Sequence, residues 1–153
     1  SKSYNLTGAR ISFVVGNKDI ISKFRLLRSQ IDYGIFYPVQ YGAIAALTGS
    51  DDFIEKQRKQ YAARNQALCG GLRKIGWNVP DSQGTMFVWA KIPEGYESSE
   101  DFCMKLMERT GVIVTPGSAF GSNGEGYVRM ALVVGEEKIQ EIIEVIDRTG
   151  MFR

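Results

Sequence analysis

The order of apolar patterns after Gly76 constrains the fold more than any other feature of the sequence. Strand-like runs and helical periodicities follow one another as strand, helix, strand, strand and helix, over residues 85–92, 98–111, 112–114, 127–134 and 139–146. The first of these two helices begins with a sequence similar to a capping box, Ser98-Ser99-Glu100-Asp101. Strands mixed with helices that pack on one face make a two-layer unit, here of about one hundred residues. The predicted fold class is therefore α/β.

Two shorter helices are predicted ahead of this unit, after a brief β-type run over residues 10–15. The first starts near Ile20, where apolar residues recur every three or four positions, and Asn17 or Asp19 can cap its start. The second runs from Pro38 to Leu47 and is apolar on every side. A helix of that kind must be covered, by a partner subunit or by another part of the protein.

A longer helix follows Ser50 and Asp51, either of which can cap it, and continues to about Ile75. Its length is sufficient to bridge two cores. We therefore expect this helix to connect two compact units, with the boundary between them along its length.

The composition excludes several classes of function. The chain has 153 residues, of which 44% are hydrophobic and 24% are charged, and this is typical of a globular protein in water. The 19 lysines and arginines against 17 acidic residues leave a formal charge of +2, so nothing favours binding to nucleic acid or to a membrane surface. No apolar run approaches the roughly 20 residues of a membrane span.

Histidine is absent from the sequence. This excludes Ser-His-Asp and Cys-His catalysis and any zinc site that contains histidine. The two cysteines, Cys69 and Cys103, cannot supply four thiolates, so no metal site is predicted. Both lie in apolar helical segments, which favours buried free thiols over a disulfide bridge. Free thiols indicate a reducing compartment, so we expect a cytoplasmic protein.

Three segments are candidates for a chemical role, and the glycine-rich loop of residues 117–126 is the weakest. It contains Gly117, Gly121, Gly124 and Gly126. Glycine loops that bind phosphate lead from a strand into a helix, whereas this loop leads into the strand that starts at Tyr127. Nucleotide binding is therefore disfavoured here.

The second candidate is Arg129, on the predicted strand of residues 127–134. Alternation gives this strand one apolar face, made of Val128, Met130, Leu132 and Val134. Arg129 lies on the other face. One interpretation is an edge-strand arginine whose head group reaches water, and the strand pattern alone favours it. The other is a guanidinium that holds a carboxylate through two parallel hydrogen bonds.

The third candidate is the opening segment of residues 1–12, where hydroxyl groups, Lys2, Gly8 and Arg10 lie close together ahead of the β-type run. Hydroxyl groups and arginine bind phosphate well, and a lysine amine is a good nucleophile when it is desolvated or beside another cation. A polar, disordered chain terminus is the alternative. Composition does not decide between them, but the order of the residues does.

The order Ser-Lys-x-Tyr-Asn-Leu-x-Gly-x-Arg, from Ser1 to Arg10, resembles the pyridoxal-phosphate lysine segment of class I/II aminotransferases, which have fold type I. Residues 112–121, Val-Ile-Val-Thr-Pro-Gly-Ser-Ala-Phe-Gly, and residues 126–129, Gly-Tyr-Val-Arg, are similar to the small-domain pattern of that family. These motifs stand in the family's order and cover almost the whole chain. The departures are Ala9, where a tryptophan is frequent, and Ser12, where glycine or alanine is usual.

The resemblance implies roles for four residues. Lys2 would be the catalytic lysine that binds the aldehyde of pyridoxal 5'-phosphate and moves the proton at the substrate Cα. Arg10, aided by Ser1, would hold the cofactor phosphate. Arg129 would bind and orient the α-carboxylate of the substrate. The implied activity is a transferase of amino-acid metabolism, which moves an amino group between an amino acid and a 2-oxo acid.

The resemblance also implies a C-terminal part of a longer enzyme, in line with a chain that starts at Ser1 without a methionine. Residues 1–49 would be the end of the large cofactor domain, and residues 50–153 the small domain with its long leading helix. Residues that contact the cofactor ring would then lie upstream, so we expect the 153-residue chain alone to be an inefficient transaminase. We also expect a homodimer, because the sites of this family are built between two subunits.

Other functions stay open at this point. A pyridoxal-phosphate-dependent C–S lyase has the same fold, although the presence of Arg10 favours a transaminase. An aminotransferase-like effector domain of a transcription regulator is a second alternative, which depends on the region upstream of Ser1. A non-catalytic α/β interaction domain is a third. Residues 31–36 and 87–96 are similar to LL-diaminopimelate, aspartate and alanine aminotransferases, which hints at the substrate class.

Overall fold

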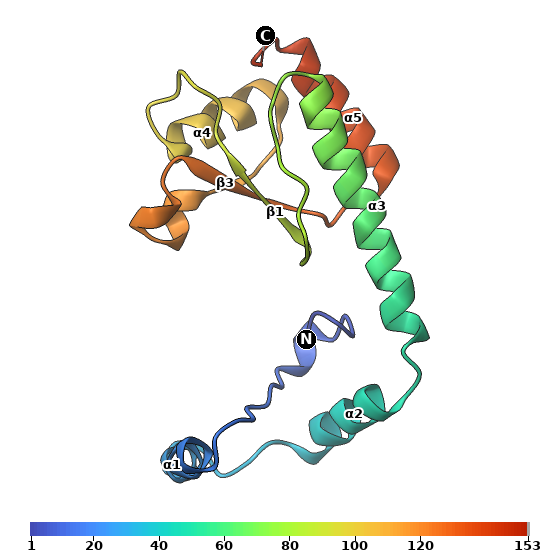
Figure 1. The fold of residues 1–153 in the computed structure, drawn as a ribbon, viewed down its shortest axis with the longest axis vertical. Coiled ribbons are helices and arrows are strands. Elements are labelled where there is room, and N and C mark those ends of the chain that lie inside the picture. Colours follow the sequence, from blue (N-terminus) through green and yellow to red (C-terminus); the bar gives the residue numbers. More distant parts are fainter. Residues whose placement is uncertain (153) are drawn as a thin grey trace. The chain divides into compact units, whose positions relative to one another are not determined.

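A computed structural model describes residues 1–152 of the chain (Figure 1). The chain divides into two compact units, Ser1–Gln57 and Arg58–Arg153. The division falls within the long helix α3 (Asp52–Lys74). None of the helices in residues 1–152 combines the length and the apolarity that a membrane crossing requires.

The first unit contains a short 3-10 helix and two α-helices before α3 begins: η1 (Thr7–Ala9), α1 (Lys18–Ser29) and α2 (Tyr37–Thr48). Asn17, and not Asp19, caps α1, because its Oδ1 accepts hydrogen bonds from the backbone nitrogens of Asp19 and Ile20 at 2.9 and 3.3 Å. The predicted β-type run over residues 10–15 is wrong. These residues pair with no strand in the described part of the chain, and a strand needs a hydrogen-bonded neighbour.

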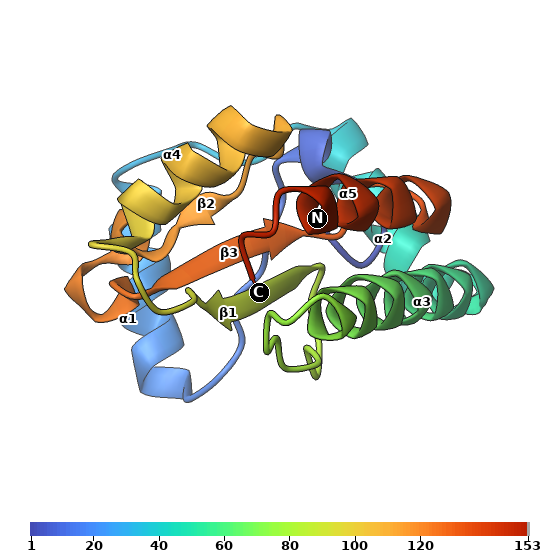
Figure 2. The ribbon, with the colours of Figure 1, turned by 90° about the horizontal axis from the view of Figure 1, so that it is seen from above.

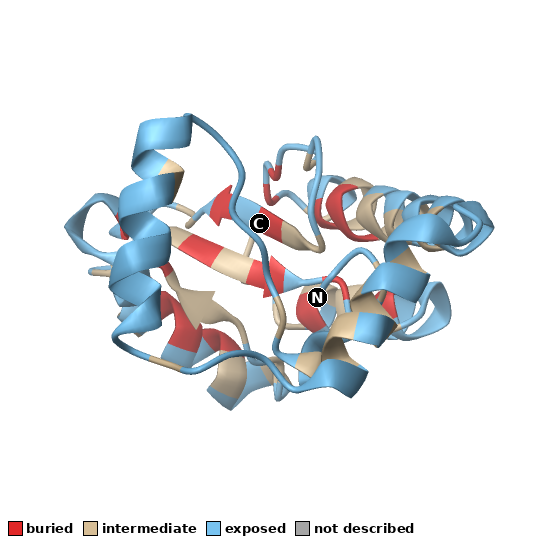
Figure 3. Cartoon of the chain, turned by 90° about the horizontal axis from the view of Figure 1, so that it is seen from below, coloured by how far each residue is buried: buried red, intermediate tan, exposed pale blue. Residues whose placement is uncertain are grey.

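This first unit has no buried core of its own. None of residues 1–57 is buried, and Figure 3 colours its helices as exposed or intermediate. On α2 the side chains of Tyr41, Ile44 and Leu47 are 67%, 55% and 57% exposed. The first unit by itself therefore does not provide the cover that was expected for α2.

The second unit contains a three-stranded antiparallel sheet in the order β1-β3-β2. Its strands are β1 (Phe87–Lys91), β2 (Thr115–Pro116) and β3 (Tyr127–Ala131). The expected strand over residues 112–114 is wrong, since the ladder begins only at Thr115. Val112 and Val114 instead pack their side chains against the hydrophobic core.

Helices α3, α4 (Ser99–Thr110) and α5 (Glu136–Arg148) complete the second unit. Figure 2 shows them beside the sheet, with α4 near β2 and α3 near β1. The core consists of alternate strand residues packed against these helices: Val88, Ala90, Val128 and Met130 with Leu68, Leu72, Phe102, Leu106, Ile139 and Ile146. The predicted apolar face of the last strand is confirmed, since Val128, Met130 and Leu132 are at most 6% exposed. The result is a two-layer α/β unit, as predicted.

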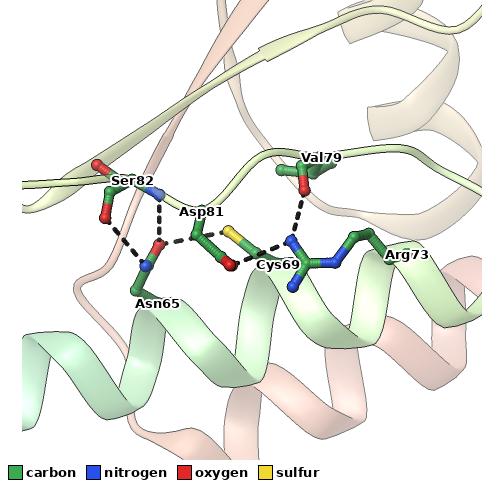
Figure 4. A network of polar contacts seen from close by, with 6 residues as sticks. All are labelled: Asn65, Cys69, Arg73, Val79, Asp81 and Ser82. Atoms are coloured by element: carbon green, nitrogen blue, oxygen red, sulfur yellow. Dashed lines mark hydrogen bonds and ion pairs between the residues drawn. The ribbon is translucent and has the colours of Figure 1, made fainter.

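Polar contacts hold the connection between α3 and β1 against the helix (Figure 4). The side-chain amide of Asn65 donates to the backbone oxygen of Ser82 and accepts from its backbone nitrogen, both at 3.2 Å. Cys69 Sγ donates to the same Asn65 Oδ1 at 3.3 Å, and Arg73 Nη1 donates to Asp81 Oδ1 at 3.0 Å. The path of the chain into β1 is therefore set by side chains of α3.

Candidate functional site

Ser1, Lys2 and Arg10 lie in the first unit, on a tightly turned segment. The backbone nitrogen of Leu6 donates to the oxygen of Ser1 at 2.8 Å, and that of Asn5 donates to the oxygen of Lys2 at 3.1 Å. Asn5 and Arg10 have left-handed backbone angles, with φ of +50° and +51°. Such conformations cost about 1–3 kcal/mol each and cluster at functional sites. The segment is thus a hydrogen-bonded turn and not an extended tail.

A side chain far along the sequence holds this turn. Gln57 Nε2 donates to the backbone oxygen of Lys2 at 3.0 Å, which ties the turn to α3. The Lys2 and Arg10 side chains are exposed, and the one acceptor for Arg10 is the Thr7 carbonyl, 3.4 Å from its Nη1. Within residues 1–152 no carboxylate pairs with either cation. Their charges are therefore available to an anion from outside this part of the chain.

Arg129 lies in the second unit, at the middle of the central strand β3. It faces Trp89 of β1 on one side and Thr115 of β2 on the other. The edge-strand interpretation is therefore wrong, because β3 has a hydrogen-bonded neighbour on each side and Arg129 projects from a face of the sheet. Arg129 projects from the face opposite to Val128 and Met130, so the sheet, and not the core, supports it.

The guanidinium of Arg129 is held by aromatic rings and by no hydrogen bond. Its Cζ lies 4.3 Å from the ring centroid of Phe87 and 4.6 Å from that of Phe120. Its Nε is buried and has no acceptor among residues 1–152. The two terminal nitrogens also have no partner there but are not buried. This arrangement offers two adjacent donors to a carboxylate, which is the geometry of a bidentate contact.

Further aromatic side chains surround this arginine. The ring of Trp89 stacks on Tyr127 at 5.8 Å between centroids and meets the ring of Phe120 edge-on at 5.6 Å. We call Phe87, Trp89, Phe120 and Tyr127 the aromatic wall. Apolar surroundings lower the local dielectric constant and so strengthen an ion pair formed with Arg129.

The aromatic wall was not predicted from the sequence. Alternation within the predicted strand of residues 85–92 would have placed Phe87 and Trp89 on one face. The register that sets Trp89 opposite Arg129 is not readable from the sequence, and neither is the return of Phe120 to this face.

The glycine-rich loop serves backbone packing. It contains two 3-10 turns, η2 (Gly117–Phe120) and η3 (Ser122–Gly124). The backbones of Gly117 and Gly124 touch, so a Cβ on Gly117 would lie 2.7 Å from the oxygen of Tyr127 and nearer still to that of Gly124. Only glycine allows this crossing.

The carboxylate of Glu125 fastens the same loop to the start of α4. It accepts hydrogen bonds from the backbone nitrogen of Ser99 at 2.6 Å, from Ser99 Oγ at 3.0 Å and from the nitrogen of Gly126 at 2.8 Å. The hydrogen bond from the Ser99 amide, followed by that from Gly126, lowers the pKa of Glu125. A carboxylate of the chain itself thus occupies the start of α4.

A hollow of about 440 Å³ lies elsewhere in the second unit, on the side of the sheet that the helices cover. Its walls are mainly apolar and include Leu72, Leu106, Met130 and Ile139. None of the predicted site residues lines it. The candidate functional residues therefore form two groups, described separately: the turn that carries Lys2 and Arg10 in the first unit, and the open sheet face around Arg129 in the second unit.

Residues 1–146 match the family described as Aminotransferase class I and II, and the chain belongs to this family. Pyridoxal 5'-phosphate is the cofactor of its members.

Named relatives agree with this assignment. The chain is 47% identical over 144 residues to LL-diaminopimelate aminotransferase of Halothermothrix orenii, a match that covers 94% of this chain and 37% of that protein. It is 43% identical over 155 residues to the glutamate-pyruvate aminotransferase AlaC of Escherichia coli, covering 100% of this chain and 37% of that protein. The chain thus spans a little over a third of the length of these relatives.

Solved structures show the same fold. Substrate-bound BacF of Bacillus subtilis superposes with a TM-score of 0.92 at 34% identity, over 99% of this chain and 39% of that one. An aminotransferase from Staphylococcus aureus gives a TM-score of 0.90 at 33% identity, over 98% and 40% of the two chains. The predicted family and fold type are confirmed.

Proposed function

We propose that this chain supplies Lys2, Arg10 and Arg129 to the active site of a pyridoxal-phosphate-dependent aminotransferase. The reaction moves an amino group from an amino acid to a 2-oxo acid. The observation that carries the proposal is the state of these three cations in a chain of this family: among residues 1–152 no carboxylate pairs with Lys2 or Arg10, and Arg129 has donors without an acceptor. The remaining groups of the site come from the rest of a longer protein.

The donor set of the opening turn fits the cofactor. Arg10 and the hydroxyl of Ser1 are suited to the phosphate, and the exposed amine of Lys2 is suited to the aldehyde carbon. When bound, the cofactor supplies an electron sink for the pair left at the substrate Cα. Lys2 removes the Cα proton and returns it, and Arg10 takes no part in that transfer because its charge is permanent.

Arg129 orients the substrate. Two donors on one guanidinium fix a carboxylate in a plane, which sets the direction of the Cα–H bond relative to the lysine amine. Lysine at position 129 would keep the charge but present a single nitrogen. It would therefore bind the carboxylate without fixing its orientation.

The test of Arg129 uses the full-length protein with an amino acid and with the amine that lacks its carboxylate. Arg129→Lys should raise the KM for the amino acid roughly 10-fold or more, as expected for loss of a charge-assisted pair. The rate with the amine should stay near that of the wild type. Arg109→Lys, on α4 and away from the sheet face, is the matched control. Equal losses with both substrates would refute the assignment.

We propose a substrate class from the named relatives, which include LL-diaminopimelate and glutamate-pyruvate aminotransferases. The expected donors are LL-diaminopimelate, glutamate or alanine, with 2-oxoglutarate or pyruvate as acceptor. A panel of these donors run on the full-length protein, each with both acceptors, measures the preference. Failure with every donor would favour another reaction of the same cofactor.

We further propose a cytoplasmic homodimer. Large apolar side chains of the first unit, such as Phe13, Val15 and Tyr33, are 72%, 80% and 107% exposed, and a stable protein needs them covered. The rest of the longer protein and a second subunit are the covers proposed. Cys69 and Cys103 are both free thiols, which fits a reducing compartment. Sedimentation of the full-length protein tests the dimer, and a monomer at all concentrations would refute it.

A further inference from the structure

We propose that Phe120 is a positioning residue, which holds the guanidinium of Arg129 in the plane that receives the substrate carboxylate. This inference rests on the proposed function of Arg129 and adds a residue that acts through it. Phe120 itself need not touch the substrate.

The first supporting observation is the set of contacts made by the Arg129 guanidinium. Within residues 1–152 its guanidinium has no hydrogen bond and no ion pair, so no acceptor sets its orientation. The rings of Phe87 and Phe120 contact it at 4.3 and 4.6 Å from Cζ, and these are its cation–π contacts. The aromatic pairs in the described residues do not include Phe87 with Phe120, so each ring contacts the guanidinium separately. Orientation of the free donors thus depends on the two rings.

The second support is how rigidly Phe120 is presented. Phe120 ends η2, the turn whose first residue, Gly117, is in backbone contact with Gly124. The loop is also fastened at Ser118, whose Oγ lies 3.2 Å from that of Ser99. A ring on such a loop keeps its place without burial, and Phe120 is indeed 51% exposed.

Phe87 and Phe120 differ in the contacts that they make apart from Arg129. Phe87 lies on β1, within the strand ladder, so its replacement would also disturb the sheet. Phe120 lies outside the sheet, and its remaining ring contact is the edge of Trp89 at 5.6 Å. Substitution of Phe120 therefore separates orientation of Arg129 from the folding of β1 and β3.

The experiment compares Phe120→Leu, Phe120→Tyr and Phe53→Leu in the full-length protein. Phe53 is the matched control, because it is equally exposed at 51% and makes no ring contact with Arg129. Phe120→Leu should raise the KM for the amino acid roughly 3- to 10-fold with little change in kcat. Phe120→Tyr should restore the wild-type KM, since the ring is kept. A KM unchanged in Phe120→Leu, or one not restored in Phe120→Tyr, overturns the proposal.

A second readout does not depend on turnover. Saturation-transfer NMR measures the dissociation constant of propionate, a carboxylate without an amino group, on the same proteins. Phe120→Leu should raise the dissociation constant of propionate by the same factor by which it raises the KM. Phe53→Leu should leave that dissociation constant unchanged. In an Arg129→Lys background, Phe120→Leu should add no further loss.

The double variant also distinguishes the proposed role of Arg129 from the proposed role of Phe120. If Arg129→Lys leaves propionate binding unchanged, the proposed role of Arg129 itself fails. If Arg129→Lys weakens binding and Phe120→Leu alone does not, the role of Arg129 stands and the positioning role of Phe120 is refuted. An additive loss in the double variant likewise refutes action through Arg129.

Discussion

Replacement of Gly117 by alanine tests the idea that the loop of residues 117–126 is built on a close backbone crossing. The backbone angles of Gly117 lie outside the left-handed region, so alanine meets no conformational barrier there. Its methyl group would lie 2.7 Å from the oxygen of Tyr127 and 2.9 Å from the carbonyl carbon of Gly124. Ordinary contacts begin at 3.4 Å, so the Tyr127 oxygen would have to retreat by 0.7 Å, the difference between 3.4 and 2.7.

The folding free energy lost in Gly117→Ala depends on which atoms the new methyl group meets. Overpacking in a folded protein costs about 1–3 kcal/mol, and flexible side chains reduce that cost by turning away. All the near neighbours of the Gly117 methyl position are backbone atoms. We therefore expect the upper end, about 2–3 kcal/mol. For a unit of about one hundred residues, this corresponds to a melting temperature lower by roughly 10–20 °C.

Thermal unfolding followed by circular dichroism measures this shift on the 153-residue chain. Gly70→Ala is the control, because a methyl group on Gly70 meets nothing within 4 Å and replaces a glycine inside α3. It should stabilise the protein by about 0.5–1 kcal/mol. A Gly117→Ala protein that melts within about 2 °C of the wild type, beside a stabilised Gly70→Ala, would refute the crossing as a rigid element.

Three further predictions concern the second unit. Hydrogen bonds from Ser99 and Gly126 hold the pKa of Glu125 below its ordinary 4.5, so its stabilising effect is present above that pH and lost as the pH falls through the lowered value. Glu125→Gln should therefore flatten the acid side of a urea-midpoint profile, and an unchanged slope would contradict this. Burial raises the pKa of Cys103 to about 11, so iodoacetamide at pH near 8 should label this thiol only after unfolding. Rapid labelling of the folded chain would count against burial. Gly71→Ala should stabilise the protein by about 1 kcal/mol less than Gly70→Ala, because its methyl group would have to displace the flexible end of the Ile143 side chain, whose Cγ1 lies 3.1 Å away. Equal melting of Gly71→Ala and Gly70→Ala would contradict that helix contact.

The elements that the sequence predicted well are those with a long period or a strong local signal. α5 carries one apolar stripe, and α4 has the predicted cap, with Ser98 Oγ accepting from Asp101 at 3.1 Å. The short strands were predicted less well. Residues 10–15 have β-forming side chains but no neighbour to pair with, and β2 is set by its register with β3 rather than by its own residues. Pairing is a tertiary property, so local propensity cannot supply it.

The candidate functional residues were likewise predicted only in part from the sequence. The strand pattern made Arg129 a candidate and the residue types made residues 1–12 a candidate, but only the resemblance to a family pattern gave Ser1, Lys2, Arg10 and Arg129 their roles. The structure adds what surrounds them: the central position of Arg129 and the contact with Phe120. Phe120 lies within residues 112–121, which resemble the family's small-domain pattern, but only the folding of residues 117–126 brings its ring to Arg129.

Reductive mapping of the cofactor tests the central claim most directly. The full-length protein is incubated with pyridoxal 5'-phosphate, reduced with borohydride, digested and analysed by mass spectrometry. We predict one equivalent of cofactor per chain on the peptide that contains Lys2, and none in a Lys2→Ala variant that retains its fold. Lys18→Ala, an exposed lysine at the start of α1, should label like the wild type. Stoichiometric labelling of another lysine, or undiminished transamination by Lys2→Ala, would contradict the account.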